Sequence, residues 1–417
     1  MKRNLACVLS ALICSAALSS CQEANQDKSS SVVDVSITDH TTTTQMDNSS
    51  AMTNPEQFTK RQVELPTTVD TSRAKLMSSF DYREIVQSEE RESYWPIAID
   101  HDDIVIQKCT DILSDNGMTY TDNAMLEYYK YNIKTGTVTK LSGNVPRYNV
   151  SMATYALVDG TIRSVCESNL GERFHFSVDL RKNHVELIKT AAVKRGPGNP
   201  YEESFFKTFA WDEHSYIEKW YELGSKVVNH VVRYDGDDAK EIVTQTGVCE
   251  YAFSNQTIYE FARDDSRHMR FVNIMDADGN LESTLYLPEV DAAANAIEML
   301  SIMDFNVLGD YLLVNVRDED KTEETCFLYH LKNKTLDLLQ DCRFLRPAQA
   351  TDSNMENWYF YLKHRKEGLS CYNLYNLDRE GNITMIAENL PAFPSMITDG
   401  QNAAFLTNNK LYFVSAQ

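Results

Sequence analysis

The side chains of this 417-residue sequence that could take part in catalysis or metal binding are isolated acids, histidines and cysteines, and they do not form a compact motif. Five aspartates lie at or near the ends of short apolar segments: Asp100, Asp159, Asp212, Asp352 and Asp399. If those segments converged, the carboxylates could hold a cation or act as general acid and base. Aspartate is also a routine turn residue, because its side chain accepts hydrogen bonds from its own backbone, and we favour that interpretation.

No established catalytic or metal-binding motif accompanies these acids. The sequence has no Gly-x-Ser-x-Gly elbow, His-Glu-x-x-His pair, Walker loop or dinucleotide fingerprint. Residues 276–280 resemble the start of a calcium loop, but Leu287 stands at the twelfth position, where such a loop needs glutamate. We therefore expect a turn at this place, no metal site and no cofactor, and we assign no catalytic residue.

Six cysteines follow the N-terminal region: Cys109, Cys166, Cys249, Cys326, Cys342 and Cys371. Cys326 and Cys342 each lie eight residues from Lys334, the centre of a hairpin turn, so they are candidate cross-strand neighbours. A disulfide between them would stabilise the fold by about 3 kcal/mol. A shift of the turn by one residue would leave them unpaired, and both alternatives stay open. The other four cysteines are typical of small buried side chains.

A repeated hairpin organises the chain around these residues. The turn residues Gly136, Asn183, Gly236, Gly279, Asn333 and Gly381 are separated by 47, 53, 43, 54 and 48 residues. A second, weaker hairpin precedes each of them. Two hairpins per repeat form a four-stranded antiparallel unit that cannot cover its own faces, and such units pack radially as the blades of a β-propeller.

The C-terminal end of the sequence indicates the number of blades. A seventh copy starts at residues 395–400 and continues through two more strands, but Gln417 ends the chain one strand short. Propellers close such a blade with a strand from the other end of the chain. We predict an all-β fold of seven four-stranded blades, closed by residues 80–86 or, less favoured, 62–65; six or eight blades remain alternatives. The five aspartates would then ring the central channel.

This pattern resembles the YWTD-type and related propellers that occur as domains of unknown function in bacterial surface lipoproteins. The resemblance lies in the spacing and the character of the strands, because the sequence contains no Tyr-Trp-Thr-Asp motif. The partners of that family therefore cannot be carried over. WD40 repeats fit less well, since Trp211-Asp212 lies in a first strand and not at the end of a third.

The N-terminal region is typical of an exported protein. Lys2 and Arg3 precede an apolar run at residues 5–18, which is too short to span a membrane and fits a secretory signal. Residues 18–21, Leu-Ser-Ser-Cys, resemble the lipobox of bacterial lipoproteins. That resemblance implies cleavage before Cys21 and lipidation of its sulfur, and several acyl chains would hold the protein stably on a membrane. The alternative is an ordinary signal peptide followed by a chance cysteine.

The predicted organisation is a signal peptide at residues 1–20, a disordered tether at 21–57 and a β-propeller at 58–417. Residues 22–57 are rich in Ser, Thr, Asn, Asp and Gln and contain no aromatic side chain, so they cannot bury enough surface to fold. The net charge of -21 argues against binding to nucleic acid or to anionic lipid headgroups.

Binding is the function that accounts for every segment. We expect a monomeric protein of the bacterial cell envelope, anchored through lipidated Cys21, that recognises a protein or glycan through one face of the propeller. Candidate binding loops are residues 111–123, residues 287–300, which we expect to include a short helix, and 194–201, where Lys194, Arg195 and Tyr201 form a basic, aromatic segment. The alternatives are an extracellular enzyme acting on carbohydrate or peptide, with acids at the channel mouth, and a structural component of envelope assembly.

Overall fold

The computed structural model divides the chain at residues 54/55, and all described residues belong to the unit Pro55–Gln417. The described ranges are 57–77, 80–81, 92–110, 125–143, 145–146, 156–167, 173–189, 204–210, 215–222, 228–235, 238–246, 249–254, 256–264, 269–293, 302–317, 324–340, 342–344, 356–366, 369–391, 396–407 and 410–417.

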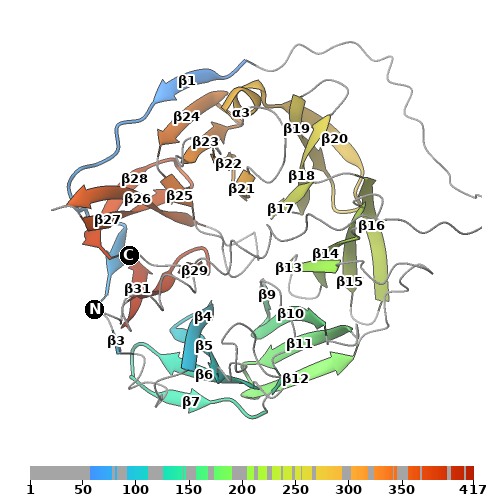
Figure 1. The fold of residues 1–417 in the computed structure, drawn as a ribbon, viewed down its shortest axis with the longest axis vertical. Coiled ribbons are helices and arrows are strands. Elements are labelled where there is room, and N and C mark those ends of the chain that lie inside the picture. The colour runs from blue at the N-terminus through green and yellow to red at the C-terminus, as the bar shows by residue number, and fades with distance from the viewer. Residues whose placement is uncertain are drawn as a thin grey trace, which may run out of the picture. The chain divides into compact units, whose positions relative to one another are not determined.

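Figure 1 shows seven antiparallel sheets arranged around a common centre, and each sheet is one blade. Blade 1 contains β4 (Glu92–Asp100), β5 (Asp103–Thr110), β6 (Met125–Asn132) and β7 (Val138–Lys140), with β8 (Val145–Pro146) also beside β6. Blade 2 contains β9 (Ala156–Val158), β10 (Thr161–Glu167), β11 (Arg173–Asp179) and β12 (His184–Lys189). Blade 3 contains β13 (Ser204–Ala210), β14 (Ser215–Glu222), β15 (Val228–Asp235) and β16 (Asp238–Thr246).

The remaining blades repeat this order. Blade 4 contains β17 (Glu250–Ser254), β18 (Thr257–Asp264), β19 (Met269–Met275) and β20 (Leu281–Tyr286), and helix α3 (Pro288–Ala293) follows it. Blade 5 contains β21 (Ile302–Leu308), β22 (Tyr311–Arg317), β23 (Glu324–His330) and β24 (Thr335–Gln340). Blade 6 contains β25 (Cys342–Phe344), β26 (Asn357–Lys366), β27 (Leu369–Asp378) and β28 (Ile383–Leu390).

Blade 7 confirms the predicted closure of the ring. Its own strands are β29 (Met396–Thr398), β30 (Ala403–Thr407) and β31 (Lys410–Ala416), and the N-terminal strands β2 (Ala74–Leu76) and β3 (Phe80–Asp81) pair antiparallel with β31. The closing pair therefore begins before the favoured segment and includes its first two residues. Residues 62–65 do not close blade 7. Instead β1 (Thr59–Gln62) pairs in parallel with β24 of blade 5 (Figure 1).

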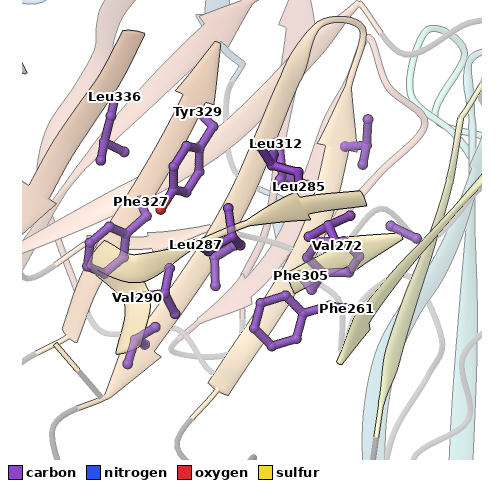
Figure 2. Packing of buried hydrophobic residues seen from close by; sticks show 14 residues of the cluster. Phe261, Val272, Leu285, Leu287, Val290, Phe305, Leu312, Phe327, Tyr329 and Leu336 are labelled. Atoms are coloured by element: carbon purple, nitrogen blue, oxygen red, sulfur yellow. The ribbon is translucent and has the colours of Figure 1, made fainter. Parts of the chain in front are cut away.

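Alternating side chains hold neighbouring blades together. A blade strand is covered on both faces, so both sets of alternate residues can be apolar. Figure 2 shows Phe261 and Val272 of blade 4 beside Phe305 of blade 5, and Phe327 of blade 5 near Val290 of α3, all in one cluster. Comparable clusters join blades 1 and 2, 3 and 4, 5 and 6, 6 and 7, and 7 and 1. Strand β13 of blade 3 contacts β9 and β10 of blade 2, which completes the ring.

The tight hairpin turns lie together at one end of the ring. Because the strands of a blade alternate in direction, the connection between its first and second strands and that between its third and fourth strands leave the same end, which we call the turn face. The third strand usually ends in a residue that accepts hydrogen bonds from the backbone of the following turn: Asn132, Asp179, Asp276, His330 and Asp378. These turns explain the repeat seen in the sequence, although in the fifth turn Lys334, not Asn333, has the positive φ, at 52°.

Candidate functional site

Three of the five predicted channel aspartates lie in the described residues, and all three are at the turn face. Asp399 accepts hydrogen bonds from the backbone N–H of Gln401 at 2.8 Å and from Asn402 Nδ2 at 3.0 Å, which is the pattern of an Asx turn. Asp159 forms an ion pair with Arg181 of the neighbouring turn in blade 2. Asp212 and Asp352 lie outside the described residues. Asp399 therefore caps its own turn, while Asp159 pairs with a neighbouring turn of the same blade.

Blades 7 and 1 bring two of these acids close to one histidine. His101 Nδ1 donates to Asp100 Oδ1 at 2.9 Å, and the His101 side chain is 92% exposed. That hydrogen bond, together with the charges of Asp100, Asp399 and Asp102, raises the pKa of His101 above its usual value, although partial burial opposes the change. Within the described part of the chain, no group of three or more His, Cys, Asp or Glu side chains could hold a metal ion.

The segment that resembles a calcium loop is a hairpin turn in the structure. Asp276 Oδ1 accepts hydrogen bonds from the backbone N–H of Asp278 at 2.9 Å and of Asn280 at 2.8 Å, and Asn280 Nδ2 donates to Oδ2. These donors, led by the Asn280 side chain, lower the pKa of Asp276. Its carboxylate therefore caps the turn between β19 and β20.

The cysteine pair is adjacent in space, but not in the predicted way. The register of β23 and β24 places Leu339, not Cys342, opposite Cys326, and Cys342 instead begins β25 of blade 6. Cys326 Sγ donates to the backbone carbonyl of Cys342 at 3.1 Å, and no disulfide joins them. The observed register differs by three residues from the one that would place Cys326 and Cys342 opposite each other in the hairpin. The disulfide between Cys326 and Cys342 stays a prediction, although the two residues are not cross-strand neighbours in one hairpin.

The remaining cysteines and the candidate loops are only partly described. Cys249 is buried, as expected, whereas Cys371 is half-buried; the side chains of Cys109 and Cys166 lie outside the described residues. The loops at 111–123 and 194–201, with Lys194, Arg195 and Tyr201, also lie outside them. In the third candidate loop the expected helix is present as α3, and its Val290 is fully buried against blades 4 and 5. No described helix is long and apolar enough to cross a membrane.

A polar row across blade 4, buried at Tyr251 and Glu260 and exposed at Thr284, was not expected from the sequence. Each strand contributes one residue: Tyr251, Glu260, Asn273 and Thr284. Tyr251 Oη donates to Glu260 Oε1 at 2.9 Å and Asn273 Nδ2 donates to Oε2 at 2.8 Å, while Thr284 Oγ1 donates to Asn273 Oδ1 at 2.8 Å. Burial, reinforced by Cys249 and Glu260, raises the pKa of Tyr251. Tyr251 is therefore a neutral donor that helps to solvate a carboxylate only 3% exposed.

A second unexpected feature is the N-terminal strap, residues 58–76, which crosses blades 5, 6 and 7. The Arg61 guanidinium binds both oxygens of Asp337, each at 2.7 Å, and Arg73 pairs with Asp378. Both aspartates are 5% exposed. The hydrogen bond from Arg61 and the charge of Asp337 raise the pKa of Arg61. The signal for this feature in the sequence is the two arginines, Arg61 and Arg73, between the predicted tether and the first blade, but nothing in the sequence identifies their partners.

Comparison with known proteins adds similarity of fold alone. No protein-family model matches the sequence, and no curated protein sequence does. The β-propeller domain of the Trilobed protease from Pyrococcus furiosus is 13% identical, with a TM-score of 0.47, over 82% of this chain and 93% of that one. An uncharacterized protein from Listeria monocytogenes EGD-e is 10% identical, with a TM-score of 0.45, over 82% of this chain and 92% of that one.

Oligopeptidase B from Leishmania major is also similar, at 8% identity and a TM-score of 0.46 over 74% of this chain. The match spans only 42% of that protein. At such identities these structures carry no information on the activity or partners of this chain. The strand topology described above defines the class of protein, a seven-bladed β-propeller closed by its N-terminal strands.

Proposed function

We propose that this chain is a membrane-anchored extracytoplasmic protein of the bacterial cell envelope, held by lipidated Cys21, that binds a protein or glycan. Propellers often serve as binding or scaffold domains, and their loops carry the ligand sites. The observation that carries the proposal is the difference between the two ends of the ring. In the described turns of this face, Asn132, Asp179, Asp276, Asp378 and Asp399 accept hydrogen bonds from the backbone of their own turns, so we assign binding to the opposite face.

The opposite face receives the longer connections. Strand β5 ends at Thr110 and β6 begins at Met125, while β12 ends at Lys189 and β13 begins at Ser204. The predicted basic segment with Lys194, Arg195 and Tyr201 belongs to the second of these connections. A cationic, aromatic segment on an acidic protein favours an anionic glycan or an acidic protein surface as the partner.

The test of binding compares the two faces. The full chain is applied to a glycan array and to envelope protein, beside a triple variant (Lys194→Ala, Arg195→Ala, Tyr201→Ala) and a turn-face control, Lys134→Ala. Lys134 is exposed and pairs with Asp102 at 2.9 Å on the turn face. We expect the triple variant to lose at least tenfold in affinity and the control to bind as the wild type. Equal binding by all three proteins would contradict the assignment of the face.

Anchoring is tested separately. Labelled fatty acid is expected to enter the wild-type chain and not Cys21→Ala, and the variant is expected to be released from membranes. If the two proteins show the same labelling and the same fractionation, lipidation of Cys21 is contradicted. The assignment of the binding face is tested independently by the binding experiment.

A further inference from the structure

We propose that the N-terminal strap is a mechanical clasp, which takes up tension on the chain before that tension reaches the strands that close the ring. The inference rests on the proposed function for the source of the tension, since a protein anchored at Cys21 is pulled from its N-terminal side. The device itself is argued from contacts of residues 58–76 with blades 5, 6 and 7.

The order of these contacts along the chain is the first observation. The strap meets blade 5 first, where Thr59 N donates to Lys334 O at 2.9 Å and β1 pairs with β24. It meets blade 6 next, where Val69 bridges Met385. Only then does β2 pair with β31 in blade 7. A pull on the chain N-terminal to Phe58 therefore acts on blade 5 before it can act on the ring closure.

The fixing of β1 is the second observation. Thr59–Gln62 is exposed throughout, so burial of its own side chains contributes little. Strand β1 is held by its parallel backbone pairing with β24 and by the packing of the adjacent Phe58 ring on Tyr329, with 5.0 Å between the ring centroids. Arg61 also donates hydrogen bonds to both carboxylate oxygens of Asp337. A bidentate pair between a guanidinium and a carboxylate is among the stronger polar contacts available. Arg61 is therefore the main side-chain attachment of this strand.

A second clamp lies at the other end of the strap. Arg73 pairs with Asp378 immediately before Ala74, the first residue of β2. Asp378 also accepts hydrogen bonds from Asn382, so its carboxylate stays positioned when Arg73 leaves. The segment between the clamps is largely exposed at 67–73. Tension must break the Arg61 clamp and then the Arg73 clamp before it loads β2.

The ring closure needs this protection because it is short. Among the described residues, three pairs join β2 to β31 and two join β3 to it, with one further backbone hydrogen bond from Met77 N to Phe413 O at 2.7 Å and one from Gln417 N to Arg73 O at 2.9 Å. Ala74 is fully buried in the cluster between blades 6 and 7. If the chain entered β2 directly, the same pull would strip the closing strand and expose the edge of β31. The strap separates the pull on the chain from the removal of the closing strand.

Force spectroscopy on the full chain, tagged at both termini and with Cys21→Ser to exclude lipid, tests the clasp. We expect a short first extension that releases the strap, followed at higher force by opening of blade 7. In Arg61→Ala the lifetime of the docked strap at constant force should fall roughly tenfold, with the second step unchanged. The matched control is Lys60→Ala, whose side chain is 58% exposed and lies 3.7 Å from Glu289; its lifetime should change by less than about twofold.

Two outcomes would overturn the proposal: opening of the ring with no separate strap step, or equal lifetimes for Arg61→Ala and Lys60→Ala. If Arg61→Ala does not fold, the charge-reversed double variant Arg61→Asp, Asp337→Arg replaces it, and restored lifetime relative to Arg61→Asp supports the clasp. The measurement uses no lipid, so failure of fatty-acid labelling would remove the anchor without affecting this result.

Discussion

Glu260 in blade 4 and Asp337 in blade 5 are two carboxylates that the propeller buries almost equally, at 3% and 5% exposure. Glu260 is held by Tyr251 and Asn273, neutral donors on the two adjacent strands of its own sheet. Asp337 is held by Arg61, a cation 276 residues away in the sequence. The donors to Glu260 come from its own blade, whereas the donor to Asp337 comes from the N-terminal strap, which is not part of the repeat.

The difference bears on when each contact forms. The partners of Glu260 are 9 and 13 residues away, so they come together as blade 4 forms its hairpins. Arg61 can reach Asp337 only when the N-terminal strap lies on a formed blade 5, which requires closing a long loop. We infer that the polar row of blade 4 opens only when the blade itself unfolds, whereas the pair of Arg61 and Asp337 can open locally.

Removing a donor from Glu260 should have the largest effect. In Asn273→Leu the Glu260 carboxylate, in a residue that is only 3% exposed, loses one of its two side-chain donors, and the free energy of unfolding is expected to fall by about 3 kcal/mol. Chemical denaturation monitored by tryptophan fluorescence measures this. The control, Thr284→Val, removes only the bond at the exposed end of the row and should cost less than about 1 kcal/mol.

A double variant sharpens this result. Glu260→Leu combined with Asn273→Leu removes the carboxylate together with its donor, and apolar replacement of a whole buried polar group is often close to neutral. We expect the double variant to regain at least half of the stability that Asn273→Leu loses. If it is less stable than Asn273→Leu, the cost comes from disturbed packing and not from the carboxylate.

Breaking the Arg61 pair should cost less and act locally. Arg61 is 52% exposed, so water can reach Asp337 once the strap loosens, and we expect Arg61→Ala to lower the free energy of unfolding by about 1–2 kcal/mol. Hydrogen exchange should accelerate in the amides of β1 and remain unchanged in β18 and β19. Equal acceleration in blade 4 would contradict the view that the strap opens independently of the ring.

The repeat made the blades predictable, because similar turn chemistry recurs: a polar residue lies at or just after the end of the third strand, and a residue with positive φ follows, as at Gly279 and Gly381. The closing of blade 7 followed from the missing last strand. The strap did not follow, since Thr59–Gln62 is polar and exposed and shows no alternation that would mark it as a strand.

Glu260 was missed for a different reason. It lies between Ile258 and Ala262 on the face of β18 that packs toward blade 3. In a sequence such a glutamate reads as one solvent-facing residue of a half-buried strand. Both faces of a blade strand are buried, however, and only the neighbouring strands show that Tyr251 and Asn273 satisfy the carboxylate.

The smallest predicted effect concerns a third carboxylate, Asp100, whose pair with His101 is exposed. Because folding raises the pKa of His101, its stabilising effect is fully present below the unfolded value of about 6.5 and is lost as the pH rises through the folded pKa. Solvent screens a side chain that is 92% exposed, so we expect less than about 0.5 kcal/mol. Titration of the His101 ring by NMR should show its pKa falling toward 6.5 in Asp100→Asn and falling less in Asp102→Asn, which removes only a weaker charge. An unchanged pKa of His101 in Asp100→Asn would mean that solvent screening abolishes the effect of the pair. The exposed carboxylate would then contribute nothing to stability through its partner, in contrast to the buried Glu260 and Asp337.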